Sequence, residues 1–128
     1  MVYRDIKFKA LSIQEVVIFG YYYKDKRNNK EYILTDEGYK YQIKPNTVCQ
    51  YIGLNTLKSN EEIYEGDVIY VNNRKFLVEP IGCEEQDGNQ YGLCVSLNGN
   101  GINGFIDSSI LKGKVIGNIF IDGDCILN

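Results

Sequence analysis

The sequence predicts a mainly β protein that folds as one domain over residues 1–128. Three observations support this. The chain holds 11 Tyr and 5 Phe with many Val and Ile, residue types that favour strands, and its only Ala is Ala10. Short apolar segments are separated by turn-forming residues, among them 13 Gly. The hydrophobic fraction of 44% and the charged fraction of 24% are typical of a folded globular protein.

The first half of the chain predicts an antiparallel meander. Its expected strands are apolar or alternating segments bounded by polar residues, at residues 6–10, 16–23, 31–35, 39–43 and 48–52. In the first segment, Ile6, Phe8 and Ala10 alternate with lysines, as in a strand with one buried face. A polar tip with Asn28–Asn29 joins the second strand to the third, and Gly53 is expected to end the last. The meander is therefore expected to occupy residues 1–52.

The second half predicts a small barrel over residues 63–121. Its expected elements are strands at 67–71, 75–79, 91–97, 105–106 and 115–121 and one helical turn at 107–112. Asn72–Asn73 fit a tight primed turn, Pro80 ends the next strand before a polar loop with Asp87–Gly88, and Gly117–Asn118 indicate a bulge or a close backbone approach. Five short strands with a helical turn before the last are the order of SH3-like barrels. We therefore expect the meander to pack on an SH3-like small barrel, a pattern that implies no ligand.

Metal and cofactor chemistry is not expected. The chain has no His, and its four cysteines are widely spaced without a Cys-x-x-Cys pair: Cys49, Cys83, Cys94 and Cys125. These features argue against a zinc site and against a nucleophile activated by His. We expect reduced cysteines that pack as small apolar residues on strands. A redox pair of Cys83 and Cys94, which flank a loop, is the alternative.

The charge and hydropathy patterns point to a cytoplasmic protein. The net charge is −3, from 14 basic and 17 acidic residues, which disfavours binding to nucleic acid without excluding it. The basic stretch at residues 24–30 is expected to be a solvated hairpin tip. The longest apolar run, residues 16–23, is interrupted by Gly20, so no membrane-spanning segment is expected, and the N-terminus lacks the apolar region of a secretory signal.

Three blocks of sequence resemble a known family. Residues 4–10 (R-D-I-K-F-K-A), residues 47–54 (T-V-C-Q-Y-I-G-L) followed by 63–69 (I-Y-E-G-D-V-I), and residues 115–120 (V-I-G-N-I-F) are similar in order and spacing to the YopX family, small proteins encoded by phages and prophages. Leu11–Ser12 departs from the Trp-Asp that is usual there. The resemblance implies a phage or prophage origin, a location inside the bacterial host cell and a mostly β fold, and it implies no reaction.

The positions that carry the resemblance are expected to be structural rather than functional. They are Gln50, Tyr51, Gly53, Ile63, Tyr64, Glu65, Gly66, Asp67, Gly117 and Asn118.

Glu65 and Asp67 are the candidates for carboxylate chemistry. Two residues apart on an extended strand, they would share a face, as a paired acid and base or as metal ligands require. Gly66 between them favours a tight bend instead, in which the Asp67 side chain caps backbone N–H groups. The spacing of the nearby acidic residues matches no calcium loop. We favour the structural interpretation.

A tyrosine strip is the candidate binding surface. Tyr21 and Tyr23 share one strand face, and Tyr39 and Tyr41 are expected to extend the strip across a neighbouring strand. Near the lysines of residues 24–26 and Lys40, such a strip could stack the bases of a single nucleic-acid strand. The alternative is that these tyrosines pack on a half-buried sheet with wet hydroxyl groups.

Taken together, the sequence favours a non-enzymatic protein-interaction module that binds a host or phage protein. The alternatives are a nucleic-acid-associated β-barrel module and a carboxylate-based enzyme that uses Glu65 and Asp67. Exposed edges of the first sheet also suggest that the protein forms a homo-oligomer.

Overall fold

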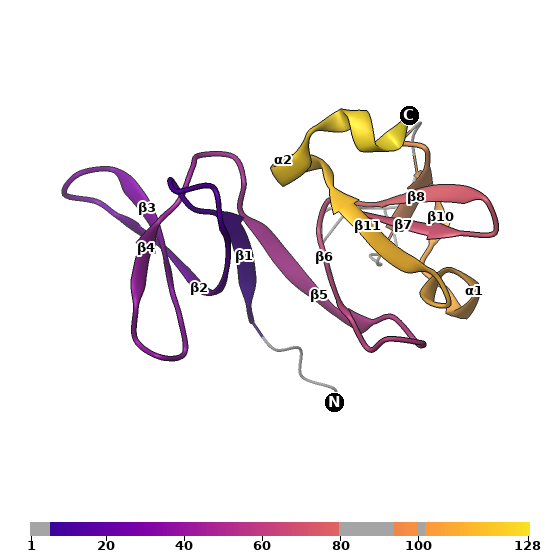
Figure 1. The fold of residues 1–128 in the computed structure, drawn as a ribbon, viewed down its shortest axis with the longest axis horizontal. Coiled ribbons are helices and arrows are strands. Elements are labelled where there is room, and N and C mark those ends of the chain that lie inside the picture. The colour runs from indigo at the N-terminus through magenta and orange to yellow at the C-terminus, as the bar shows by residue number, and fades with distance from the viewer. Residues whose placement is uncertain (1–5, 80–93, 100–101) are drawn as a thin grey trace, which may run out of the picture.

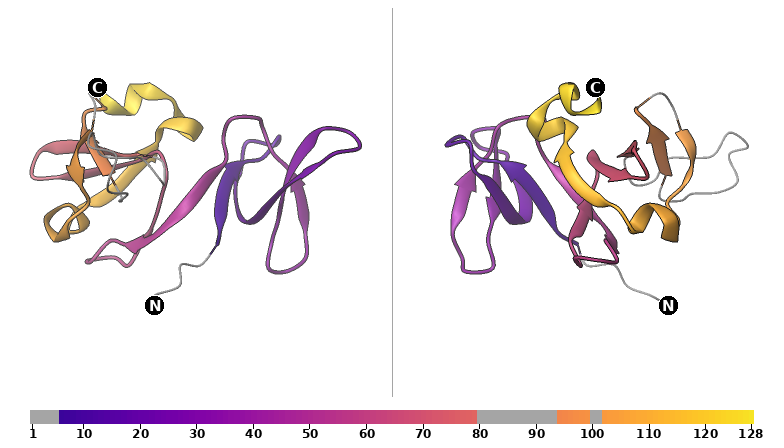
Figure 2. Two further views of the ribbon diagram at one scale, coloured as in Figure 1. Left: turned by 180° about the vertical axis from the view of Figure 1, so that it is seen from behind. Right: turned by 45° about the vertical axis from the view of Figure 1, so that its right-hand side comes forward.

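The protein is mainly β, as the sequence predicts, and its strands form two antiparallel sheets. The computed structural model describes residues 6–79, 94–99 and 102–128. Figures 1 and 2 show two lobes side by side, an N-terminal lobe built from β1 to β4 and a C-terminal lobe built from β7 to the C-terminus. The hairpin of β5 and β6 runs between them. Among the described residues, no helix is long and apolar enough to cross a membrane.

The first sheet has six strands in the order β4-β3-β2-β1-β5-β6. Their bounds are β1 Phe8–Leu11, β2 Val17–Asp25, β3 Lys30–Leu34, β4 Lys40–Gln42, β5 Cys49–Asn55 and β6 Glu62–Tyr64. The predicted hairpin of β2 and β3 is confirmed. Asn29 adopts a φ of 62° at its tip, a conformation that Asn accepts more readily than most residues.

The first sheet differs from a simple meander in the place of β5. This strand pairs with β1 rather than with β4, and an isolated bridge between Ser12 and Ile43 brings the end of β4 against the end of β1. The free edge of β1 is thereby paired, which satisfies its backbone groups. The curled sheet buries a small cluster of Ala10, Ile33 and Ile43.

Gly53 does not end β5, contrary to the expectation. The strand continues to Asn55, and Gly53 has a φ of 88° within a register shift between Tyr51 and Asn55. It is therefore a bulge residue, because glycine adopts this backbone conformation without the penalty of a Cβ.

The second sheet has five strands in the order β10-β9-β8-β7-β11. Its elements are β7 Asp67–Val71, β8 Arg74–Val78, β9 Cys94–Leu97, β10 Ile102–Phe105, α1 Ser108–Leu111 and β11 Lys114–Asn118. The last strand returns to pair with β7 after the helical turn α1, an order consistent with the expected SH3-like barrel. Asp107 caps α1 as predicted, and Asn72 and Asn73 form the predicted turn with φ values of 53° and 62°.

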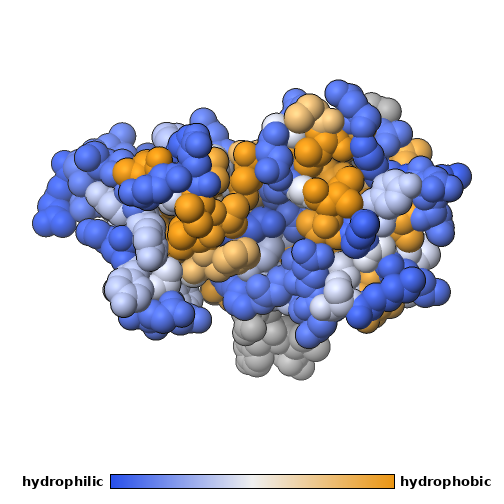
Figure 3. Space-filling view, in the orientation of Figure 1, coloured by the Kyte–Doolittle hydropathy of each residue, from blue (hydrophilic) through white to orange (hydrophobic). Residues whose placement is uncertain are grey.

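The core of the C-terminal lobe draws on both sheets. Its buried members are Ile52, Ile63, Ile69, Val78, Val95 and Ile110. Ile52 and Ile63 come from β5 and β6, which belong to the six-stranded sheet. The change from one sheet to the other therefore falls at the Glu65–Gly66 turn, inside the block at residues 63–69. Hydrophobic side chains also reach the surface on both lobes (Figure 3).

The end of the chain departs from the predicted strand at residues 115–121. β11 ends at Asn118, which caps the helical turn α2, Ile119–Asp122, and a 3₁₀ turn follows at Asp124–Leu127. The bulge expected at Gly117 is present, because the register shifts between Val115 and Gly117. The close approach is also real: a Cβ on Gly117 would lie 3.1 Å from Asp122 Oδ2. Pro80, Cys83 and the Asp87–Gly88 loop lie outside the described residues.

Candidate functional site

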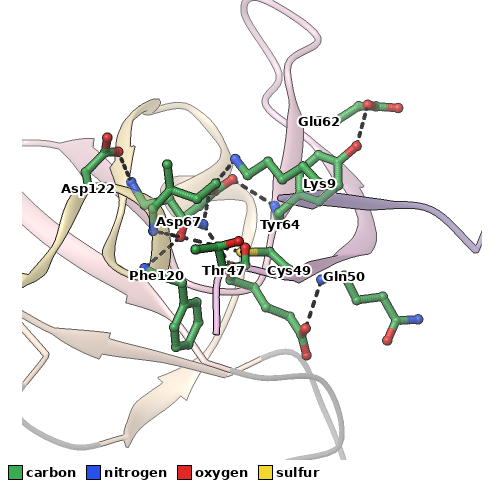
Figure 4. Close-up of polar contacts among 12 residues, drawn as sticks. Lys9, Thr47, Cys49, Gln50, Glu62, Tyr64, Asp67, Phe120 and Asp122 are labelled. Carbon is green, nitrogen blue, oxygen red and sulfur yellow. Dashed lines mark hydrogen bonds and ion pairs between the residues drawn. The ribbon is translucent and has the colours of Figure 1, made fainter. Parts of the chain in front are cut away.

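The most specific sequence blocks meet in a buried polar centre where the two lobes join. We call this centre the junction and define it by Lys9 of β1, Asp67 of β7 and Asn118 of β11, three side chains joined by hydrogen bonds. Figure 4 shows Lys9 and Asp67 pointing toward each other, with Tyr64 and Cys49 beside them. The junction thus links strands from both ends of the chain.

Asp67 is the centre of the junction. It starts β7 directly after the Glu65–Gly66 turn and is fully buried. Its Oδ2 accepts a hydrogen bond from the Tyr64 backbone N at 2.8 Å, which is the backbone cap that the sequence predicts. Its Oδ1 accepts from Lys9 Nζ at 2.7 Å and from Asn118 Nδ2 at 2.8 Å. Burial raises the pKa of Asp67 above its ordinary value, although Lys9 and Asn118 act in the opposite direction.

Asn118 uses every polar atom of its side chain. Its Nδ2 donates to the Glu65 backbone carbonyl at 2.9 Å and to Asp67. Its Oδ1 accepts from the backbone N of Phe120 at 2.9 Å and of Ile121 at 3.3 Å, which caps α2. An Asn at this position therefore fixes the turn before β7 and the start of α2 together.

The side-chain carboxylates of Glu65 and Asp67 make different contacts. Oε1 of Glu65 accepts a hydrogen bond from the Gln50 backbone N at 2.9 Å, whereas Asp67 binds Lys9 and Asn118. The two carboxylates therefore hold different parts of the fold. No group of three or more His, Cys, Asp or Glu that could hold a metal occurs within the described part of the chain.

Gly66 is required by both its backbone angle and its surroundings. Its φ is +81°, and a Cβ there would lie 2.4 Å from Cδ2 of the Phe120 ring. The ring of α2 thus packs directly on the backbone of the turn. Any side chain at this position would strain the turn and displace the ring.

Cys49 is a buried thiol beside the junction. Its Sγ lies 3.3 Å from the Thr47 carbonyl oxygen and 3.5 Å from Asn118 Oδ1. Burial raises the pKa of the Cys49 thiol to about 12, so the thiol stays protonated at neutral pH. Cys125 is exposed, and both are free. The alternative pair of Cys83 and Cys94 cannot be placed, since Cys83 and the Cys94 side chain lie outside the described residues.

The rings of Tyr51 and Tyr64 pack together at the junction. Their centroids are 5.6 Å apart, and Phe19 meets Tyr64 at 5.8 Å. Lys9 Nζ lies 4.8 Å from the centre of the Tyr64 ring. Lys9 is the residue that sequence reasoning missed, because its place between apolar residues of a strand predicts a solvent-facing side chain.

The predicted tyrosine strip does not hold together. Strand register places Tyr41 opposite the fully buried Ile33, which itself lies opposite Tyr22. Tyr41 therefore faces away from the side that Tyr21 and Tyr23 share. It cannot connect them to Tyr39, which is exposed just before β4. Paired strands keep directly opposite residues on one face.

The side of β2 that carries Tyr21 and Tyr23 has other neighbours. Tyr23 stacks on Tyr32 with ring centroids 5.4 Å apart, and Lys40 Nζ lies 4.6 Å from the centre of the Tyr32 ring. Apolar side chains at alternate positions continue this side along β2 and onto β3. We call it the aromatic face, made of Val17, Phe19, Tyr21, Tyr23 and Leu34, all of which are exposed.

The fold and the junction define a small β protein with two lobes that share one buried polar centre. The chain belongs to the YopX family, because the family model described as YopX protein matches residues 4–124, nearly its whole length. The resemblance drawn from the three sequence blocks is thereby confirmed. The chain shows no significant similarity to a curated protein or to a solved structure.

Proposed function

We propose that this protein is a non-enzymatic interaction module of a phage or prophage, which binds a host or phage protein in the bacterial cytoplasm through its aromatic face. The observation that carries the proposal is the exposure of β2. Phe19 and Tyr21 are 52% and 54% exposed on a strand that lies in the interior of its sheet. A contiguous exposed apolar surface of this kind is typical of protein interfaces, which are enriched in aromatic residues.

The aromatic face includes a hollow beside β2. Ile6, Phe19 and Tyr21 line it together with three charged residues, Lys7, Asp36 and Glu62. A hollow lined by both apolar and charged groups suits a partner side chain that makes apolar and polar contacts together. Asp67 is buried and both of its carboxylate oxygens accept hydrogen bonds from other residues of the chain, which supports a non-enzymatic function.

The test is affinity capture of the tagged protein from infected or prophage-bearing cells, with bound protein and bound nucleic acid both identified. We expect one protein to be enriched by the unaltered chain and lost with Tyr21→Ala. Tyr70→Ala is the matched control, since Tyr70 is an exposed tyrosine of the other lobe. Capture of the bait alone, or equal capture by both variants, would count against the proposal.

A nucleic-acid-associated role is the second candidate, favoured by the stack of Tyr23 on Tyr32 with Lys40 over it. The net charge of −3 opposes it. Fluorescence anisotropy with single-stranded DNA and RNA tests this role. Binding that weakens with salt and with Lys40→Gln would support the nucleic-acid role. Absence of binding at low salt would exclude it.

Self-association is proposed as a third property of the N-terminal sheet, whose outer strands are β4 and β6. Light scattering after size-exclusion chromatography measures it directly. We expect a mass above that of the 14.6 kDa chain, and a monomer at high concentration would contradict this expectation.

A further inference from the structure

We propose that the junction forms an intramolecular isopeptide bond, in which Nζ of Lys9 replaces the amide nitrogen of Asn118 and ammonia is lost. This bond would be a self-modification that occurs once per chain, and it does not depend on the proposed interaction function. The proposal rests on the contacts of three side chains, Lys9, Asp67 and Asn118.

The attacking amine of Lys9 and the amide nitrogen that would leave Asn118 both donate a hydrogen bond to the same oxygen atom of Asp67. Asp67 Oδ1 lies 2.7 Å from Lys9 Nζ and 2.8 Å from Asn118 Nδ2. A carboxylate in this position can take a proton from the attacking amine and deliver one to the departing amide nitrogen. Its second oxygen is fixed by the Tyr64 backbone N, which orients the group.

The carbonyl that would be attacked is already polarised. Oδ1 of Asn118 accepts hydrogen bonds from the backbone N–H groups of Phe120 and Ile121, at 2.9 Å and 3.3 Å. When an amine adds to Cγ, negative charge develops on this oxygen. Two backbone donors that are fixed before the reaction would stabilise that charge, as in the oxyanion holes of acyl-transfer enzymes.

The surroundings keep water away from the three side chains. Asp67 is fully buried, Asn118 is 2% exposed, and the Lys9 side chain is 13% exposed beside the Tyr64 ring. The proposed reaction begins with transfer of a proton from the Lys9 ammonium to Asp67, a carboxylate whose pKa is raised by burial. The neutral amine that results is the form of lysine that attacks carbonyl groups.

The reaction balances without an oxidant or a co-reactant. Asp67 takes a proton from the Lys9 ammonium, and the free amine adds to Cγ of Asn118 to form the new N–C bond. Asp67 then gives its proton to Nδ2 of Asn118 and accepts one from Nζ of Lys9, which is now bonded to Cγ. The C–Nδ2 bond breaks, the electron pair on Oδ1 restores the carbonyl, and ammonia leaves.

The product keeps part of the hydrogen bonding of the junction, because the new amide has a single N–H and the Glu65 carbonyl loses the donor that Nδ2 supplied. The N–H of the new amide can donate to Asp67 Oδ1 in place of the two donors that it replaces. Oδ1 of Asn118 remains a carbonyl oxygen that caps α2. The bond would join β1 to β11, and with them the two lobes.

Intact-mass spectrometry of the full-length, natively purified chain tests the proposal. We expect a mass one ammonia below that of the sequence, and a protease digest that contains a branched peptide joining Lys9 to Asn118. The unaltered sequence mass would overturn the proposal. Loss of one water would overturn it as well, since it would place the bond on the Asp67 carboxyl group.

Two matched variants complete the test. Lys9→Arg keeps the positive charge but should retain the full mass, since a guanidinium does not form this amide. Lys7→Arg alters a neighbouring lysine that pairs with Glu62 at the surface and should still lose ammonia. Asn–Gly sequences such as Asn98–Gly99 can lose ammonia as succinimides, but such a loss would persist in Lys9→Arg. Persistence of the mass loss in that variant would therefore contradict the proposal.

Discussion

The two lobes use their apolar residues differently. In the N-terminal lobe the buried cluster is small, made of Ala10, Ile33 and Ile43, while the aromatic face of the same sheet stays exposed. The C-terminal lobe buries a larger cluster and takes Ile52 and Ile63 from the neighbouring hairpin to complete it. The comparison suggests that the C-terminal lobe supplies stability and that the N-terminal lobe carries the surface available to a partner.

The largest expected effect lies at the junction, where both lobes depend on Asp67. Asp67→Ala leaves the largely buried side chain of Lys9, which is 13% exposed, without its carboxylate and should lower the free energy of unfolding by about 3–5 kcal/mol. Urea denaturation followed by tyrosine fluorescence measures this loss. Glu37→Ala, at an exposed turn residue, is the control, and a loss no larger than that of the control would show that the junction does not stabilise the fold.

Core truncations in each lobe test whether the lobes unfold together. Ile33→Ala and Ile69→Ala remove fully buried side chains and should each cost about 2–5 kcal/mol. Because β5 and β6 serve both lobes, we expect a single thermal transition in both variants, shifted as a whole. Calorimetry that resolved a second transition in either variant would show that the two lobes unfold independently.

A smaller effect is expected at Gly66. Gly66→Ala places a methyl group against the Phe120 ring at a φ of +81° and should cost about 1–3 kcal/mol. Gly38→Ala is a close control, because Gly38 has a φ of +89° but open space around a Cβ. The difference in melting temperature between the two variants isolates the contact with Phe120, and equal shifts would assign the whole effect to the backbone.

The two described free cysteines should differ in reactivity, which can be measured in the unaltered protein. With a thiol pKa raised to about 12, Cys49 should resist iodoacetamide at neutral pH, whereas the exposed Cys125 should react. Peptide mapping by mass spectrometry identifies the labelled site. Equal labelling of both residues in the native protein would show that the region around Cys49 opens to solvent.

Local features of the fold could be predicted from the sequence, and distant pairings could not. The turns at Asn29 and at Asn72–Asn73 depend on residues that accept a positive φ, which is a property of the residue itself. The pairing of β5 with β1 depends on which edge is free after the sheet has curled. The face that Tyr41 occupies depends on register across two strand pairs, and an error of one residue reverses it.

The candidate site shows the same division. The cap formed by Asp67 follows from a Gly flanked by acidic residues, and it could be predicted. The partners Lys9 and Asn118 could not, because they lie 58 and 51 residues away along the chain and meet Asp67 only after both sheets have formed.

The β5–β6 hairpin has a consequence for how this chain can be divided. Its strands belong to one sheet by hydrogen bonding, while Ile52 and Ile63 fill the core of the other lobe. A cut after residue 64 would leave an N-terminal fragment in which these two apolar side chains are exposed to water. The C-terminal fragment would have a core that lacks them. The two halves should therefore recombine as complementing fragments when mixed, rather than persist as separate miniature proteins.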